Sequence, residues 1–233
     1  MKLSKRLQNI DGMISKEYDH IWDCCCDHGL LGIYLLARNA ATIIHFVDVV
    51  EPLMDDLVSR LLTHQADHVR QATLQNKSPS EWQVHCFGAE KIPIEGNGSN
   101  LVIVAGVGGD LLIEIVEAIL LRHPNQDLEF LLCPVHHNYK VRQSLISLGL
   151  NLIDEKLVKE NKRFYEVIHA ARETKQSISP VGSMMWDFSR EDDNEYLKQT
   201  LAHYQRIQKN KHSALLKDTQ TIISDYRALN TSA

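Results

Sequence analysis

Several features that define other protein classes are missing from this 233-residue sequence. No apolar run approaches the ~20 residues that a membrane-spanning helix needs. The charged segment 1–10 has no apolar core of the kind found in secretory signals, so we expect no leader peptide. Only five cysteines are present, and three of them are adjacent, at Cys24, Cys25 and Cys26. Neighbouring cysteines rarely reach the geometry of a disulfide bridge, so the sequence favours a reducing cytoplasm.

An excess of positive charge is also missing. The 25 Lys and Arg residues are outnumbered by 30 Asp and Glu residues, which gives a net charge of −5. This balance excludes a strongly basic nucleic-acid-binding protein, so an RNA partner would have to bind at a local basic patch. Hydrophobic residues make up 44% and charged residues 24% of the chain, which is typical of a soluble globular protein and excludes a disordered one.

What the sequence does contain is a regular alternation of short apolar runs with helical patterns. Apolar and β-branched runs predict strands at 20–26, 42–49, 82–87, 101–105, 128–133, 150–158 and 163–171. Helical spacing predicts helices at 30–38, 53–70, 110–121 and 139–148. Strands that alternate with helices form βαβ units, so we expect an α/β fold with a mostly parallel sheet. The last two strands predict a terminal antiparallel hairpin, and this arrangement is that of class I methyltransferases.

The chain after this sheet is predicted to be helical. Ser, Gly and Pro near the start of 174–189 predict a linker. Apolar residues spaced by three and four beyond it predict one helix, or two helices in a hairpin that breaks near 209–211. We therefore expect an α/β domain at 1–173 and a small helical, coiled-coil-like domain at 190–233.

The strongest local motif is WDCCCDHG at residues 22–29, at the carboxyl end of the first predicted strand. In an open α/β sheet, the ligand crevice lies outside the carboxyl ends of the strands. Small residues in such a loop let the backbone approach a ligand, and here they are Cys25, Asp27 and Gly29. Asp23 adds a carboxylate that suits an amino group or a ribose. The alternative is an irregular strand–helix turn with buried, unreactive thiols.

Two further segments are predicted at the same edge of the sheet. Asp48 follows the second strand, where dinucleotide-binding and methyl-donor-binding folds bind ribose hydroxyls. A helix-capping network before Pro52 is an alternative that is compatible with this role. Ala105 and Gly106 begin a glycine-rich turn after the fourth strand, which allows positive φ and close approach. No Lys-Ser/Thr pair follows, so this turn is not a phosphate-binding P-loop, and a tight strand–helix turn is the alternative.

The segment CPVHHNY at residues 133–139 follows the fifth strand. In many nucleobase methyltransferases this position presents the target base, and it uses polar and stacking side chains. His136, His137 and Tyr139 are therefore candidates for contact with a substrate, and a loop with exposed histidines is the alternative.

Metal and hydrolase chemistry receive little support. His64 and His68 are four apart on a predicted helix and could place two imidazoles on one face, but a third ligand is not evident. No Cys-x-x-Cys pair exists outside the triple-cysteine run, and the Gly-x-Ser-x-Gly elbow of serine hydrolases is absent. We therefore expect no metal site.

Taken together, the motifs resemble the TrmK family of tRNA (adenine-N1)-methyltransferases, which act on adenosine 22. The matching segments are LSKRLQ at 3–8, Asp23-x-x-x-Asp27-His28, AGVGG at 105–109, Arg142, IDE at 153–155 and FYEV at 164–167. The resemblance implies a class I, Rossmann-like methyltransferase fold whose mostly parallel seven-stranded sheet ends in an antiparallel hairpin, with a helical C-terminal domain. It also implies S-adenosyl-L-methionine as cofactor and tRNA as partner. A monomer and a weak dimer are both compatible with the sequence.

The motifs also imply roles for individual residues. The expected cofactor-binding residues are Arg6, Asp23, Cys25, Asp27, Gly29, Asp48, Ala105 and Gly106. The expected catalytic residues, which would contact the base or take its proton, are His28, His137 and Tyr139.

The chain departs from the family at three places. Cys25 replaces a Gly of the first loop, Phe87-Gly88 replaces Asp-Gly, and Cys133-Pro134-Val135 replaces Gln-Pro-Asn. These departures leave open an alternative function, a non-catalytic or weakened methyltransferase-fold module that binds RNA or protein. A NAD-dependent dehydrogenase is less favoured, because no Gly-x-Gly-x-x-Gly follows the first strand.

Overall fold

The computed structural model describes residues 3–74, 78–209 and 214–229, and the side chains of all of these but 66–69, 71, 73–74 and 214–217. Within these residues a seven-stranded sheet has the order β3-β2-β1-β4-β5-β7-β6. Its strands are β1 (Tyr18–Cys24), β2 (Ala41–Asp48), β3 (Glu81–Cys86), β4 (Asn100–Ala105), β5 (Leu128–Cys133), β6 (Asn151–Glu160) and β7 (Arg163–Ala171). Pairing is parallel from β3 to β5 and antiparallel at β5-β7 and β7-β6. The predicted class I α/β fold is therefore confirmed.

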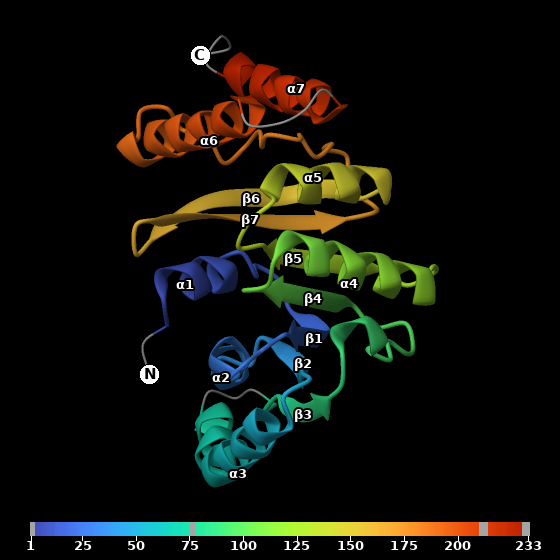
Figure 1. The fold of residues 1–233 in the computed structure, drawn as a ribbon. Coiled ribbons are helices and arrows are strands. Elements are labelled where there is room, and N and C mark those ends of the chain that lie inside the picture. Colours follow the sequence, from blue (N-terminus) through green and yellow to red (C-terminus); the bar gives the residue numbers. More distant parts are fainter. Residues whose placement is uncertain (1–2, 75–77, 210–213, 230–233) are drawn as a thin grey trace.

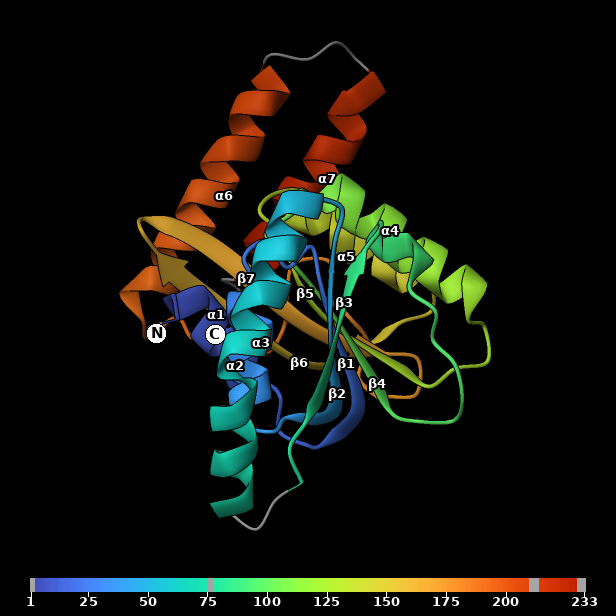
Figure 2. The same cartoon turned by 90° about the horizontal axis from the view of Figure 1, so that it is seen from below.

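Helices cover both faces of the sheet (Figures 1 and 2). They are α1 (Lys5–Gly12), α2 (Leu30–Ala37), α3 (Glu51–Leu74), the 3-10 helix η1 (Ala89–Lys91), α4 (Gly109–Arg122), α5 (Asn138–Ser147), α6 (Glu191–Lys209) and α7 (Ala214–Ala228). α1, α2 and α3 pack on one face, and α4 and α5 pack on the other. α6 and α7 lie side by side beyond the β6–β7 end of the sheet. Two helices therefore follow the sheet, which is one of the two arrangements that the sequence predicts. The predicted break near 209–211 falls at the end of α6 and at residues 210 and 211, and residues 210–213 are outside the described residues.

The central strand β4 shows why the sheet is buried on both faces. Leu101 and Ile103 point into the core beneath α1, α2 and α3, whereas Val102 and Val104 point into the core beneath α4 and α5. All four side chains are fully buried, as expected for a strand whose side chains alternate between two covered faces. This rigid centre fixes the positions of the loops that leave its carboxyl edge.

The helix α1 is not predicted by the sequence patterns. Its N-cap is Ser4, whose hydroxyl accepts a hydrogen bond from the Leu7 N–H at 3.3 Å, which satisfies one of the free donors at a helix start. Ile10 is fully buried and anchors the helix against α2 and the sheet. The helix also packs beside β6 and β7, and it carries Arg6 to the carboxyl edge of the sheet.

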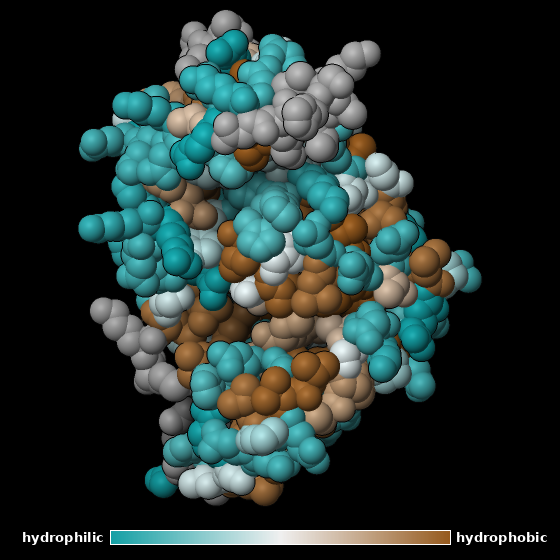
Figure 3. Space-filling view, in the orientation of Figure 1, coloured by the Kyte–Doolittle hydropathy of each residue, from teal (hydrophilic) through white to brown (hydrophobic). Residues whose placement is uncertain are grey.

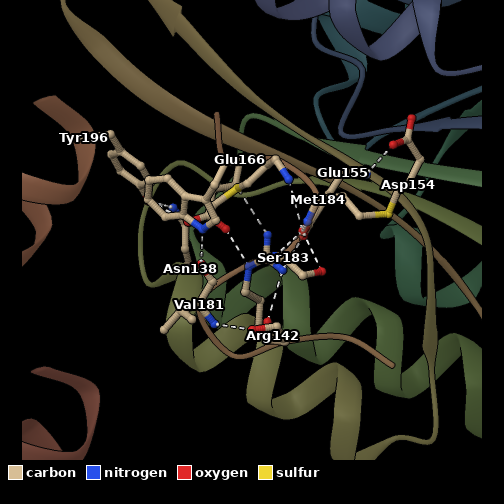
Figure 4. Close-up of polar contacts among 12 residues, drawn as sticks. Asn138, Arg142, Asp154, Glu155, Glu166, Val181, Ser183, Met184 and Tyr196 are labelled. Atoms are coloured by element: carbon tan, nitrogen blue, oxygen red, sulfur yellow. Dashed lines mark hydrogen bonds and ion pairs between the residues drawn. The ribbon is translucent and has the colours of Figure 1, made fainter. Parts of the chain in front are cut away.

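A buried polar cluster, which we call the arginine node, connects the sheet with the C-terminal helices (Figure 4). It consists of Arg142, Glu155, Glu166 and Tyr196. The Arg142 guanidinium of α5 lies 2.6 Å from a carboxylate oxygen of each glutamate, one on β6 and one on β7. The Tyr196 hydroxyl of α6 donates to Glu166 at 2.6 Å. Three motif residues of the sequence therefore meet in one structural contact.

The segment 174–189 contributes to this packing. Ile178, Val181 and Met185 are buried, and the backbone N–H groups of Ser183 and Met184 donate to Glu155. The segment is therefore an irregular, packed connection, although its role as a boundary between two domains stays a prediction.

Candidate functional site

The topology places a crevice at the carboxyl ends of β1 and β4. The chain leaves β1 toward β2 on one side and leaves β4 toward β5 on the other, so the direction of the connections reverses between these two strands. Ligands of open α/β sheets bind at such a switch point. In Figure 3, which keeps the orientation of Figure 1, the surface is hollowed beside α1 at the level where Figure 1 places β1 and β4, with hydrophobic residues around the hollow. We call this region the donor crevice.

The loop after β1 forms one wall of the donor crevice. Its residues Cys25, Asp27 and Gly29 all have left-handed backbones, with φ of 56°, 51° and 65°. These are the three positions at which the sequence predicts small residues. A side chain at Gly29 would come within 2.8 Å of Leu57, so glycine is required there for space as well as for φ. The loop thus adopts a glycine-like path although two of its three positions are not glycine.

Asp48 holds this loop to the end of β2. One carboxylate oxygen accepts the Asp27 N–H at 2.9 Å, and the other accepts the N–H groups of Val49 and Val50 at 2.8 and 3.2 Å. The structure therefore brings the candidates Asp27 and Asp48 together. A carboxylate has about four acceptor positions, so these three bonds leave it the capacity for a further donor.

Asp23 lies beneath the loop and is almost completely buried. Its carboxylate accepts the Gly32 N–H of α2 at 2.9 Å. Burial raises the pKa of Asp23 to about 7, with a smaller contribution from the charge of Asp48, and the Gly32 N–H opposes the shift. A positive group bound nearby would favour the ionised form.

Arg6 forms the opposite side of the donor crevice. Its guanidinium nitrogens lie 3.8 and 3.9 Å from the position that a Cβ on Gly106 would occupy, and Gly106 has a φ of +86° directly after Ala105. Its Nε is buried and has no hydrogen-bond partner among the described residues. An arginine whose buried Nε has no such partner suits a ligand carboxylate.

A role for Glu90 at this site is not predicted from the sequence. Its carboxylate folds back over Gly88 and occupies the space that a side chain at Gly88 would need. Burial raises the pKa of the Cys25 thiol to about 11, and the negative charges of Asp48, Asp23 and Glu90 add to this effect. Glu90 is therefore near the loop after β1. The available signal is an acidic residue two positions after Gly88 and three positions after Phe87, where the family that the sequence resembles has an aspartate.

The three catalytic candidates occupy different surroundings. His28 is exposed, with its Nε2 3.7 Å from an Asp27 carboxylate oxygen. His137 begins α5 with a φ of 63°, and its Nδ1 lies 3.1 Å from a carboxylate oxygen of Asp110. Tyr139 is buried, and its hydroxyl donates to Asp225 of α7 at 2.7 Å. This contact joins α5 to α7, so the geometry gives the catalytic role of Tyr139 no support.

The described part of the chain contains few groups suited to metal binding or to disulfide formation. No cluster of three or more His, Cys, Asp or Glu residues suited to a metal ion occurs among the described residues. His64 is exposed, and the side chain of His68 lies outside the described residues. All five cysteines are free. None of the described helices has the length and apolar character needed to cross a membrane.

Comparison with known proteins supports the fold. A family model described as a methyltransferase domain matches residues 3–168. The chain is similar to M. capricolum TrmK in complex with S-adenosyl-homocysteine, with a TM-score of 0.74, 17% identity and 98% of each chain covered. It is also similar to the B. subtilis m1A22 tRNA methyltransferase TrmK, with a TM-score of 0.68, 20% identity and coverage of 97% of this chain and 98% of that one.

An uncharacterized protein from Listeria monocytogenes gives a TM-score of 0.72 at 18% identity, with 97% of this chain and 99% of that one covered. At such identities the similarities establish the fold. No curated protein sequence matches the chain significantly.

Proposed function

Because the chain belongs to the methyltransferase domain family, we propose that it is an S-adenosyl-L-methionine-dependent RNA methyltransferase that modifies N1 of an adenine in tRNA. The observation that carries the proposal is the left-handed backbone at Cys25, Asp27 and Gly29, at the switch point of the sheet. This conformation lets backbone atoms approach a ligand, as a glycine-rich donor loop does. The TrmK structures of similar fold support the choice of RNA as substrate.

The residues present fit the cofactor. When bound, S-adenosyl-L-methionine supplies a methyl group activated by a sulfonium. The free acceptor capacity of Asp48 suits a ribose hydroxyl, and the unpartnered Nε of Arg6 suits the methionine carboxylate. Asp23, whose raised pKa reflects burial, can ionise when the ammonium group of the donor is nearby. The protein's main contribution is alignment of the two reactants in a site that excludes water.

Glu90 takes the place of the missing aspartate. Where the family has Asp-Gly, the chain has Phe87-Gly88, and the Glu90 carboxylate lies over Gly88. A carboxylate at this point suits the amino group of the donor's adenine. The departure at Phe87 is therefore compensated by a residue of the following 3-10 helix.

His137 is the better supported catalytic candidate. Adenine N1 attacks through its own lone pair, and the methylated base carries a positive charge until a proton leaves its amino group. Asp110 orients the His137 imidazole through its Nδ1, which leaves Nε2 to accept a proton. His28, next to Asp27, is the second candidate for this role. The target base must first leave its stack, at a cost of a few kcal/mol.

We expect the reaction to take place in the cytoplasm, because all five cysteines are free and tRNA is the proposed substrate. The candidate residues all come from one chain, so a monomer suffices for the chemistry.

Methyl transfer to unmodified tRNA transcripts tests the proposal. The purified protein is incubated with tritiated S-adenosyl-L-methionine and the transcripts, and the digested nucleosides are analysed by mass spectrometry. We expect 1-methyladenosine, located by a reverse-transcription stop because the methyl group blocks base pairing. Donor binding without any methyl incorporation would instead support the non-catalytic binding module.

A further inference from the structure

A second cavity lies at the carboxyl edge of the sheet, beside the donor crevice. It has a volume of about 450 Å³ and lies between the β6–β7 turn, the loop after β5 and helix α6. We call it the hairpin cleft. Its lining includes His137, Lys162, Arg163, Phe164, Tyr165 and Tyr204. Its size falls within the range of small-molecule sites, about 300–1,000 Å³.

Arg6 links the hairpin cleft to the donor crevice. Its guanidinium carbon lies 5.0 Å from the centre of the Tyr165 ring, while its nitrogens lie near Gly106 of the donor crevice. The two sites are thus separated by a single side chain. A ligand in the hairpin cleft would lie next to a substrate that meets the methyl donor.

The walls of the hairpin cleft present ring faces that are held in place. Phe164 packs on Tyr196 at 5.2 Å between ring centres, and Tyr204 stacks on Tyr226 at 6.1 Å. Tyr204 and Phe164 are only half-buried, so part of each ring remains accessible. Fixed, partly exposed rings provide stacking surfaces for nucleobases.

The rim of the hairpin cleft carries positive charge that the protein does not neutralise. Lys162 and Arg163 are exposed at the β6–β7 turn, where Asn161 and Lys162 have left-handed backbones. Within the described residues, neither cation has an ion-pair partner. Lys159 of the same hairpin, in contrast, is paired with Asp192 and Glu195 of α6. In a protein with a net charge of −5, such a local cationic rim can attract a phosphate.

We propose that the hairpin cleft binds one unpaired nucleotide of the RNA substrate, a neighbour of the nucleotide that is methylated. Its base stacks on Tyr204 and Phe164, and its phosphate contacts Lys162 and Arg163. This proposal rests on the proposed function, and it gives that function a recognition site directly beside the point of methyl transfer, because the catalytic candidate His137 lines one end of the cleft. The combination of ring faces and free cations is the one that single-stranded nucleic acid requires.

The test uses two variants with matched controls. Tyr204→Leu removes the ring but keeps an apolar side chain, and its control is Phe188→Leu, which changes an aromatic residue outside the cleft that stacks on Trp186. The double variant Lys162→Ser/Arg163→Ser removes the cationic rim. Its control, Arg122→Ser/Lys175→Ser, removes the same charge from exposed residues at the opposite edge of the sheet. Thermal unfolding shows which variants fold like the wild type.

Steady-state methylation of unmodified tRNA transcripts is measured over a salt series, together with calorimetric binding of S-adenosyl-L-methionine. We expect each cleft variant to raise KM for RNA by about ten-fold, while kcat and donor affinity stay unchanged. The double variant should also make KM less sensitive to salt, since each lost phosphate contact lowers the log–log slope by about 0.7. The control variants should behave like the wild type.

The outcomes separate the two proposals. If the wild type methylates RNA and the folded cleft variants show an unchanged KM, the hairpin cleft is not a nucleotide site, and the proposed function stands. If the wild type binds the donor but neither binds nor methylates the transcripts, the proposed function fails, and the cleft proposal fails with it.

Discussion

Asp48 combines support of the loop after β1 with proposed binding of the donor ribose. We expect Asp48→Ala to weaken binding of S-adenosyl-L-methionine by ~1–3 kcal/mol, the range for a lost hydrogen bond to a charged group. Calorimetric titration measures this change. Asp19→Ala is the matched control, because Asp19 also accepts backbone and side-chain hydrogen bonds, from Ser99, but at the amino edge of the sheet. Equal affinity of a folded Asp48→Ala protein would remove Asp48 from the site.

Asp23 predicts a pH dependence of stability. Its pKa is about 7 in the folded protein and 3.8 as the ordinary value. Because folding raises this pKa, the contribution of the neutral Asp23 to the free energy of unfolding is fully present below pH 4. This contribution is lost as the pH rises through 7. Asp23→Asn keeps an acceptor for the Gly32 N–H without the buried charge. The variant should therefore gain roughly 3–5 kcal/mol over the wild type between pH 4 and pH 8, at about 1.4 kcal/mol per pKa unit.

Urea unfolding of both proteins across this pH range measures the difference. Parallel stability curves for the two proteins would show that Asp23 ionises normally.

At single positions, sequence reasoning succeeds where a residue's chemistry follows from its place on a strand. Asp27 and Asp48 are predicted at one edge of the sheet, and they share a hydrogen bond there. It fails where the partner comes from a distant segment. The hydroxyl of Tyr139 is directed to Asp225, 86 positions away, and no local pattern indicates this contact. The position of the Glu90 carboxylate is not predicted either, because it depends on the side chain folding back over Gly88.

Between elements, the arginine node carries the attachment of the C-terminal helices. Arg142→Met should destabilise the protein by about 3–5 kcal/mol, because it leaves two buried carboxylates without their cation. Denaturant unfolding measures the loss. Lys140→Ala is the control on the same helix, since it breaks only an exposed ion pair with Asp110 and should change stability far less. An equal, small effect of both variants would contradict a supporting role for the node.

The strands β1, β2 and β3 are joined by a chain of three imidazoles. His45 Nε2 lies 3.0 Å from His20 Nδ1, and His45 Nδ1 lies 3.1 Å from His85 Nε2, with the Trp22 ring stacked on His45. Burial lowers the pKa of His45 to about 3, and the neighbouring histidines His85 and His20 add to this shift.

The lowered pKa means that His45 stabilises the fold above pH 6.5 and that this stability is lost as pH falls toward 3. His45→Gln, which cannot be protonated, should therefore show a weaker loss of stability than the wild type between pH 6.5 and pH 4. Urea unfolding at a series of pH values provides the comparison. An identical pH slope in both proteins would show that His45 gains its proton as easily in the fold as in the unfolded chain.

The elements of the sheet are largely predictable because each strand is a short apolar run between turns, and all seven predicted strands are present. The helix α1 is different. It is a short segment with a single fully buried residue, Ile10, so its apolar periodicity is too weak to predict it. Tertiary packing against α2, β6 and β7 determines this element, and with it the position of Arg6.

For the whole molecule, a net charge of −5 is compatible with an RNA partner only if the basic residues that contact the RNA form a local patch. Within the part of the chain that the structure describes, cations without an ion-pair partner are present at both proposed sites, Arg6 at the donor crevice and Lys162 and Arg163 at the hairpin cleft. The overall negative charge keeps non-specific binding of nucleic acid weak. Recognition must then depend on these few contacts and on stacking.

Every proposed step requires the donor to bind at the loop after β1, so the decisive measurement is calorimetric titration of the wild-type protein with S-adenosyl-L-methionine. We expect saturable binding of one donor per chain, weakened in Asp48→Ala and unchanged in Asp19→Ala. The absence of any binding at millimolar donor would contradict it.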